Sequence, residues 1–302
     1  MSGVLAAALL LWICPVRAED EACLGCHADQ GMAEAPQLAP GKLQLSVHKN
    51  LGCAACHAGM DEVPHPKKTA PVSCAGCHRK SGDAIRASDH GRLLLKTLSG
   101  AALCAACHGP AHELRRVKDP KSTVSRANIP ATCNRCHQKL DLKGKFGVEP
   151  FSSYAQTVHG KAHIAGDIKA AICVDCHGGH DLDFSNNSRS RAYRFNIPGT
   201  CGRCHPGPLA LYSRSSHGKK SAAGVKDAPV CTDCHGEHNI QSFTEPGSMV
   251  FTGSIVKTCS ACHGSETLSA KFAVPLDPAR AYLDSYHGLA FTAGNLSAAN
   301  CA

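Results

Sequence analysis

The sequence has few of the residues from which a hydrophobic core is normally built. Only 5% of its 302 residues are aromatic, with one Trp and four Met. No stretch shows the alternation of apolar and polar residues that predicts a β-strand. The apolar run near the N-terminus is too short to span a membrane, and no other stretch is apolar enough to do so. An ordinary globular domain is excluded, because these side chains could not offset the entropy lost on folding.

What the sequence has in abundance is the pentapeptide Cys-x-x-Cys-His, which occurs nine times and uses 18 of the 20 cysteines. Two thiols three positions apart can each add to one vinyl group of a haem, and the adjacent His then lies under the iron. The motifs therefore predict nine covalently bound haem c groups. The attaching residues are Cys23, Cys26, Cys53, Cys56, Cys74, Cys77, Cys104, Cys107, Cys133, Cys136, Cys173, Cys176, Cys201, Cys204, Cys231, Cys234, Cys259 and Cys262, with His27, His57, His78, His108, His137, His177, His205, His235 and His263 as proximal ligands.

Other uses of Cys-x-x-Cys account for the pattern less well. A zinc site needs four ligands and does not require a His fused to every pair. A redox disulfide is expected once on a thioredoxin-like unit, not nine times. A secreted disulfide scaffold would explain the cysteines but not the histidines.

On these motifs the chain resembles the multihaem c-type cytochromes over nearly all of its mature length. We expect a mainly irregular fold with short α-helices, a haem-cored repeat architecture and little or no β-sheet. The haems would replace the missing core, so the chain without haem should be largely unfolded.

The formal net charge of +8 does not indicate a nucleic-acid partner. A ferric bis-histidine haem with two ionised propionates carries about −1, so nine haems would bring the protein near neutrality. The excess of Lys and Arg is explained more simply by pairing with propionates.

The N-terminus predicts export. Residues 4–13 are apolar, and Val16 and Ala18 are small residues at the positions that precede a cleavage site, so residues 1–18 are interpreted as a signal peptide. Cys14 lies inside the apolar run without the small residue that lipid attachment requires. A periplasmic or extracellular location agrees with covalent haem attachment.

After the signal peptide, the chain divides into an N-terminal single-haem segment and a series of repeats. Each repeat contains a short helix ending in a His, a loop, a first motif, a post-motif His and a closing motif. The segment covers 19–40, and the repeats cover 41–86 (shortened), 87–149, 150–207, 208–277 and 278–302, the last of which is truncated.

Residues around the helix-end histidines recur in ways that predict local structure. Pro150, Pro208 and Pro278 lie nine positions before a His and suit a helix start. Ser or Thr lies two positions before the His, and Gly follows it in four repeats. We expect a helix of about nine residues that ends at the His with a left-handed Gly. Ile-Pro before the closing motifs at 133 and 201 predicts an extended or turn segment.

A second set of histidines supplies candidates for the sixth iron ligand. They are the helix-end residues His48, His90, His159, His217 and His287 and the post-motif residues His65, His112, His180 and His238. Met is too scarce to serve generally, so bis-histidine ligation at low potential is expected. His163 is left over, and sequence alone does not say which distal His serves which haem. Tyr154, Tyr212 and Tyr282 are expected to pack against porphyrins.

Cys301 lies 14 positions after His287, the spacing that separates His90, His159 and His217 from their next Cys. It is interpreted as the first thiol of a tenth motif, so a tenth haem is expected in a longer protein.

The predicted function is electron transfer along a chain of fully ligated haems, without catalytic residues. The resemblance implies anaerobic respiration, with a membrane quinol-oxidising module or other redox proteins as partners and periplasmic or extracellular acceptors. The alternative is a reductase of nitrite, hydroxylamine or a sulfur oxyanion with one open haem. The Cys-x-x-Cys-Lys motif common in such nitrite reductases is absent from the sequence. A filament-forming cytochrome is compatible with the electron-transfer function.

Overall fold

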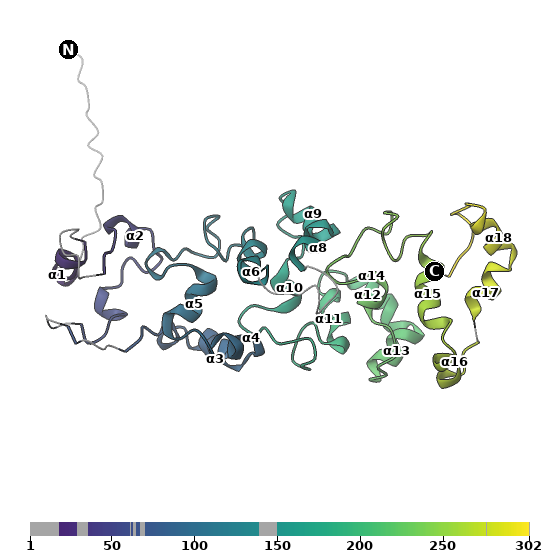
Figure 1. Ribbon diagram of the computed structural model, residues 1–302, viewed down its shortest axis with the longest axis horizontal. Coiled ribbons are helices and arrows are strands. Elements are labelled where there is room, and N and C mark those ends of the chain that lie inside the picture. Colours follow the sequence, from purple (N-terminus) through teal and green to yellow (C-terminus); the bar gives the residue numbers. More distant parts are fainter. Residues whose placement is uncertain are drawn as a thin grey trace, which may run out of the picture.

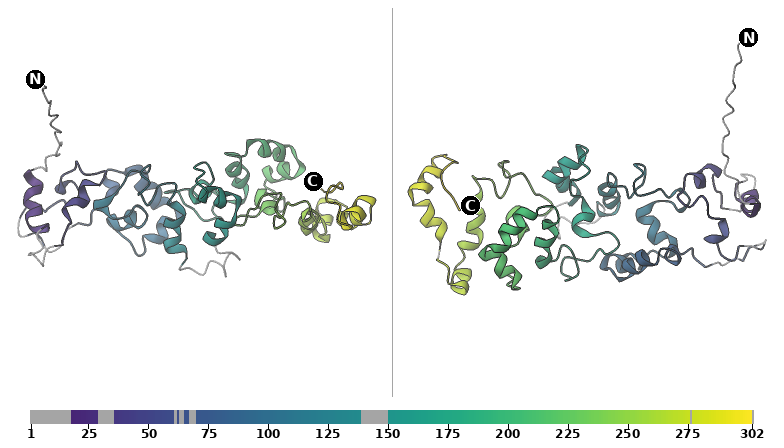
Figure 2. Two further views of the ribbon diagram at one scale, coloured as in Figure 1. Left: turned by 90° about the horizontal axis from the view of Figure 1, so that it is seen from above. Right: turned by 180° about the vertical axis from the view of Figure 1, so that it is seen from behind.

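The structure is a computed structural model that describes residues 18–28, 36–60, 62, 65–66, 70–138, 150–275 and 277–301. Short helices follow one another along a single long axis, from α1 (Ala18–His27) to α17 (Pro278–Leu283) and α18 (Tyr286–Thr292) (Figure 1). The molecule is also narrow in the two further views (Figure 2). Residues 1–17 of the predicted signal peptide and 29–35 of the following segment lie outside the described residues.

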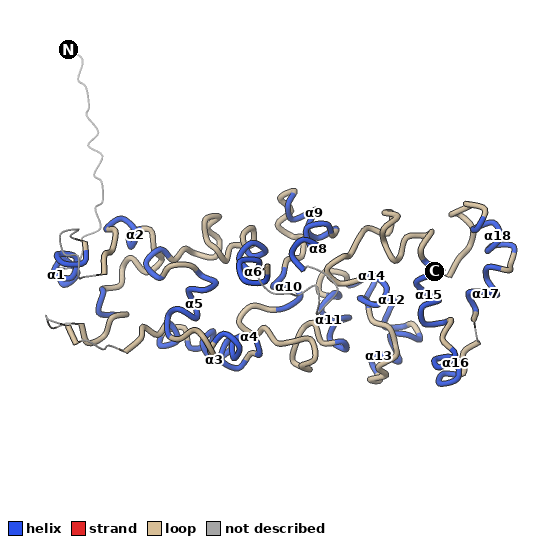
Figure 3. The backbone as a smooth tube through the Cα atoms, in the orientation of Figure 1, coloured by secondary structure: helices blue, strands red, loops and turns tan. Residues whose placement is uncertain are grey.

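The described part of the chain contains helices, helical turns and loops but no β-strand (Figure 3). The prediction of short helices with little or no sheet is therefore confirmed. No described helix has the length and apolar character needed to cross a bilayer. The other helices are α2 (Pro40–Gln44), α3 (Arg79–Ala87), α4 (Asp89–Leu94), α5 (Gly100–His108), α6 (Ile129–His137), α8 (Pro150–Gln156), α9 (Val158–Ile164), α10 (Cys173–His177), α11 (Ile197–Gly202), α12 (Pro206–Arg214), α13 (Ser216–Ala222), α14 (Cys231–His235), α15 (Ile255–His263) and α16 (Glu266–Phe272), with 3₁₀ turns η1 (Cys53–Ala55), η2 (Cys74–Gly76), η3 (Ala111–Glu113) and η4 (Arg194–Asn196).

Before four of the five helix-end histidines, the single helix that was expected is two helices with a break just before the histidine. His48 instead lies in a turn after α2, with no second helix. Between α8 and α9, the Thr157 hydroxyl donates to the Tyr154 carbonyl at 2.7 Å and accepts the Gly160 N–H at 2.9 Å. A hydroxyl in this position caps the second helix and competes with the backbone of the first. The histidine therefore lies in the first turn of the second helix, and its predicted place at a helix end is wrong. Ser88, Ser215 and Ser285 make the same pair of hydrogen bonds.

The glycines after these histidines have a different role from the one predicted. They lie buried inside the second helices at Gly91, Gly160, Gly218 and Gly288. A Cβ at Gly160 would overlap the Tyr154 carbonyl oxygen of the preceding helix. Glycine is required here because two helices approach at backbone contact. The left-handed glycines instead follow the second helices, at Gly166, Gly224 and Gly294.

Replacing Gly160 with Ala should destabilise the protein, because the added Cβ forces α8 and α9 apart. We expect a loss of about 3 kcal/mol in the free energy of unfolding. Gly199→Ala in α11 is the control, since no atom lies within 4 Å of its added Cβ. That change should stay within about 1 kcal/mol. Denaturant unfolding followed by far-UV circular dichroism measures both, and equal stabilities would contradict the close-approach explanation.

Proline also begins helices where an extended segment is expected. Ile129–Pro130 and Ile197–Pro198 form the first turns of α6 and α11. Proline is favourable there because its fixed φ suits the helix and its missing N–H would be unpaired anyway. The extended or turn prediction for these segments is wrong. Pro150 and Pro278 begin α8 and α17 as predicted, while Pro208 lies in the first turn of α12.

Apolar side chains form no continuous core in the described part of the chain. The largest cluster joins Ile255, Val256 and Ala279, with four half-buried neighbours against it. Large apolar side chains such as Ile168 and Phe243 stay exposed. This matches the composition, which offers too little apolar volume for a core of side chains alone. The buried apolar residues are Ala170, Ile172, Ala228, Val230, Ile255, Val256 and Ala279.

A repeated backbone hydrogen bond joins neighbouring units near the helix-end histidines. The donor is the helix-end histidine or the residue before it, and the acceptor lies two positions after the post-motif histidine of the following unit. The start of α4 or α9 is therefore covered by the next unit. The bonds are Val47 N–H to Leu114 O at 2.8 Å, His90 N–H to Leu182 O at 3.1 Å and Val158 N–H to Ile240 O at 3.0 Å.

Candidate functional site

The Cys-x-x-Cys-His motifs lie on helices or helical turns. In α5, α6, α10, α14 and α15 the motif histidine is the last helical residue. Positions three apart share one face of a helical turn, so both thiols of a motif face the same side. All described cysteines are free, which leaves them available for covalent attachment.

The structure brings the histidines together in pairs, which sequence spacing alone does not specify. In eight pairs the two ring centroids lie 5.8–6.4 Å apart, and each pair joins one motif histidine to one non-motif histidine. The pairs are His27–His65, His48–His78, His57–His112, His90–His137, His108–His180, His159–His205, His177–His238 and His217–His263.

The separation of the paired rings fits an iron atom between them. Two iron–imidazole bonds of about 2 Å each, with about 1.1 Å from each ring centre to its nitrogen, place the two centroids about 6 Å apart. The paired histidines thus fit the two axial positions of one haem, and the adjacent cysteines fit its attachment.

The pairs follow two rules that connect the units. A helix-end histidine pairs with the closing motif of its own unit, as His159 does with His205. A post-motif histidine pairs with the first motif of the preceding unit, as His238 does with His177. His65 follows the second rule with the N-terminal segment, because it pairs with His27. Under the second rule, a distal histidine lies beside a motif of a different unit.

Burial favours the neutral form of several of the paired imidazoles, and the neutral form is the one that binds iron. Burial, together with the nearby His238 and His137, lowers the pKa of His177 to about 4. Burial followed by the charge of the ring partner also lowers the pKa values of other members of the pairs. These are His57, His90, His108, His159 and His217.

Consecutive motifs lie against one another through their cysteines, in an alternating manner. The first cysteines of two motifs come within hydrogen-bond reach at Cys23–Cys53, Cys74–Cys104, Cys133–Cys173 and Cys201–Cys231. At the intervening junctions the second cysteines of two motifs lie near each other. Burial raises the pKa of the first-named thiol in each pair, and the neighbouring thiol raises it as well. These pairs are Cys56–Cys77, Cys107–Cys136, Cys176–Cys204 and Cys234–Cys262. The attachment positions therefore form an unbroken row.

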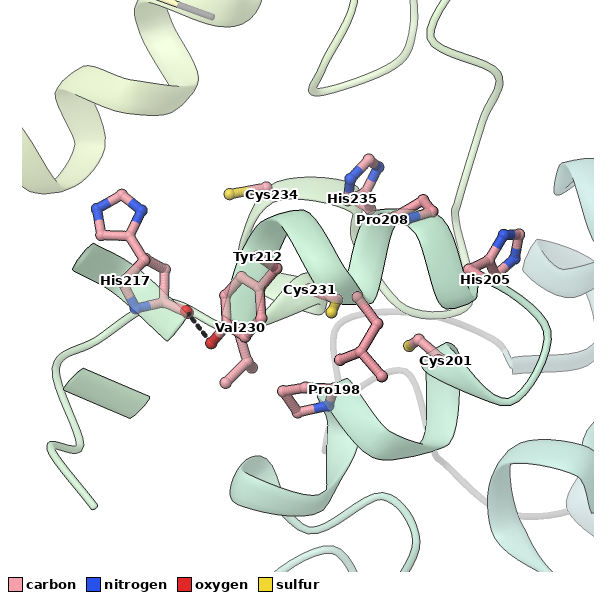
Figure 4. A pocket seen from close by; sticks show the side chains of 13 residues that line it. Pro198, Cys201, His205, Pro208, Tyr212, His217, Val230, Cys231, Cys234 and His235 are labelled. Carbon is pink, nitrogen blue, oxygen red and sulfur yellow. Dashed lines mark hydrogen bonds between the residues drawn. The ribbon is translucent and has the colours of Figure 1, made fainter. Parts of the chain in front are cut away.

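One pocket shows how two motifs share a space. It lies among α11, α12, α13 and α14, and its lining includes Cys201 and His205 of one motif and Cys231 and His235 of the next (Figure 4). Tyr212 also lines it, with its hydroxyl donating to the Pro229 carbonyl at 3.0 Å. An aromatic ring at this place is consistent with packing against a porphyrin.

The tyrosine hydrogen bond recurs two residues before a motif and fixes the backbone there. Tyr154 donates to Ala171 at 2.9 Å and Tyr282 to Ala299 at 3.0 Å, as Tyr212 does to Pro229. Each acceptor lies two positions before a first cysteine. These tyrosines therefore connect the helix before a helix-end histidine to the start of the next motif.

A repeated arginine–aspartate contact was missed by sequence reasoning. Arg126, before α6, pairs with Asp175 of α10 at 2.6 Å and donates to the carbonyls of Ile168 and Ala170. Arg194 makes the equivalent contact with Asp233 of α14 at 2.9 Å. Each contact joins a closing motif to a first motif. The signal was the recurrence of Arg-x-Asn before Ile-Pro and of Asp inside Cys-x-Asp-Cys-His.

Three histidines have no imidazole partner among the described residues. His163 has its Nε2 atom 3.3 Å from the Ala127 carbonyl oxygen. His235 belongs to a motif, and His287 is a helix-end histidine whose ring contacts that of Tyr286. The predicted balance of nine motifs and nine distal histidines thus becomes eight pairs with one unmatched histidine of each kind.

The geometry of the described residues does not support the zinc or disulfide alternatives. Within the described ranges, no three His, Cys, Asp or Glu side chains gather as a metal site of protein ligands would require. No family model, no curated protein and no solved structure matches the chain.

Proposed function

We propose that this protein is an exported multihaem c-type cytochrome that carries electrons along a row of haems. The observation that carries the proposal is the set of eight histidine pairs, each of which joins a motif histidine to a distal one at about 6 Å. Haem iron supplies one-electron chemistry by alternating between its ferric and ferrous states.

The residues of the chain hold and tune each site. At eight of the nine motifs, two thiols would hold the porphyrin edge and two imidazoles would bind the iron. A filled coordination shell at those eight sites would leave no place for a substrate, which favours a carrier over an enzyme. Imidazole on both sides, without Met, favours a low potential.

The arrangement of the motifs supports transfer over the length of the molecule. First cysteines meet at Cys133–Cys173, and second cysteines lie near each other at Cys176–Cys204, so the motif at 173–177 contacts its neighbours on both sides. The same alternation repeats along the elongated chain. A membrane quinol-oxidising module at one end and periplasmic or extracellular acceptors at the other are the proposed partners.

Haem counting tests the proposal directly. Pyridine-haemochrome spectra and intact mass should give nine covalent haems on the exported chain after removal of residues 1–18. Secreted protein that is colourless yet compactly folded would overturn the proposed function.

Replacing His159 with Ala should convert one haem from low spin to high spin while its thioether bonds remain. The change leaves His205 as the sole axial imidazole of that iron. Electron paramagnetic resonance and intact mass measure the two effects. His163→Ala is the matched control, four positions later on the same helix, and should leave the spectrum unchanged. An unchanged spectrum in the His159 variant would contradict distal ligation.

A further inference from the structure

The unpaired His235 departs from its counterparts in the other units. His57, His108 and His177 are the first-motif histidines of three earlier units, and each pairs with a post-motif histidine of the following unit. Those three side chains are half-buried, whereas His235 is exposed. No described residue supplies an imidazole to it.

The start of α13 lacks a covering segment in the same way. At the start of α4, the Asp89 carboxylate accepts the Phe184 N–H at 3.1 Å and the Asn187 side-chain amide at 2.8 Å. On α9, Lys161 pairs with Glu245 at 3.1 Å. These partners lie after the post-motif histidine of the next unit.

No described segment covers the equivalent positions on α13. Ser216 and His217 are exposed, although His90 and His159 are half-buried. The Ser216 N–H has no acceptor among the described residues, whereas the equivalent Val158 donates to Ile240. The segment that would cover α13 is the same one that would bring an imidazole to His235.

His287 and its surroundings are a third exposed region, after His235 and the start of α13. Tyr286 beside it is 83% exposed, and Leu289 on the same helix is 62% exposed. The first rule pairs a helix-end histidine with a closing motif of its own unit, and no described motif is left for His287. Cys301 nevertheless lies against Cys259, just as Cys231 lies against Cys201. The last unit is therefore placed on the preceding unit in the same way as the earlier units are placed on theirs.

On the basis of the proposed function, we infer that the surface formed by His235, α13 and α18 binds a further haem-bearing segment of the same repeat design. A post-motif histidine of that segment supplies the sixth ligand to the iron held by His235. The backbone that follows it accepts the Ser216 N–H, and a closing motif of the segment takes His287. A small ligand would explain His235 alone, whereas one repeat segment explains all three positions in a single register.

The spin states of the holo-protein test the inference. On the ferric protein produced from this sequence, one haem in nine should be high spin by electron paramagnetic resonance and should become low spin when imidazole is added. The double change Cys231→Ala and Cys234→Ala should remove that signal. Its control, Cys201→Ala with Cys204→Ala, should lose a low-spin haem and keep the high-spin one.

Two histidines at the same helix position give a matched comparison. His217→Ala should add a second high-spin haem, because His217 pairs with His263 within the chain. His287→Ala should add none. A monomeric protein whose haems are all low spin, or a new high-spin haem in the His287 variant, would overturn the inference. Absence of bound haem would instead refute the proposed function.

Discussion

Produced without covalent haem attachment, the chain is expected to show no cooperative unfolding transition and to lose most of its helix signal. The helices are too short to be stable alone. The few buried apolar residues, of which Val230 and Ile172 are the most enclosed, form no continuous core. The proposed haems would therefore provide the folding energy through their binding, as metals do in small domains that fold only with their metal.

Far-UV circular dichroism during denaturant titration measures this effect. The control is the same sequence secreted with its haems, which should unfold cooperatively. A compact haem-free chain with a sharp transition would show that the side chains suffice, and the proposed role of the haems would be lost.

The second large effect is expected from removing one haem in the middle of the row. Cys173→Ala with Cys176→Ala should lower the mass by one haem and nearly abolish conduction between the ends. This motif contacts its neighbours through both of its cysteines, at Cys133 and near Cys204. Single-molecule conductance along the long axis measures the loss.

The matched control removes a haem from one end. Cys23→Ala with Cys26→Ala also costs one haem, but it leaves the other eight attachment sites contiguous. Its conductance should stay close to that of the unchanged protein over the remaining length. If the two variants conduct equally, electrons do not follow the row of motifs.

The sequence identifies both sets of histidines but not their pairing. His108 is identified because it is the last residue of a Cys-x-x-Cys-His motif. His180 is identified because a histidine recurs shortly after these motifs. Nothing local connects the two residues, because they belong to different units and meet only when the chain is folded. Pairing is a long-range property, and it became visible only in the three-dimensional arrangement.

The wrong predictions of local structure around the helix-end histidines have a common physical cause. A Ser or Thr before a His can continue one helix or cap the next, and local propensity does not separate these outcomes. The close approach that excludes a side chain at Gly160 is likewise a contact between helices. At Pro130 and Pro198 the alternative of a helix start competes with an extended segment, and the helix start prevails.

Pairing across units also limits how such a chain can change in length. Deleting the stretch from His159 to His180 would remove the partners of His108 on one side of the cut and of His205 and His238 on the other. A deletion by one complete unit, in contrast, restores every match between the units that become neighbours. Viable length variants of this protein should therefore differ by two haems at a time, and an odd step should leave a site without its second imidazole.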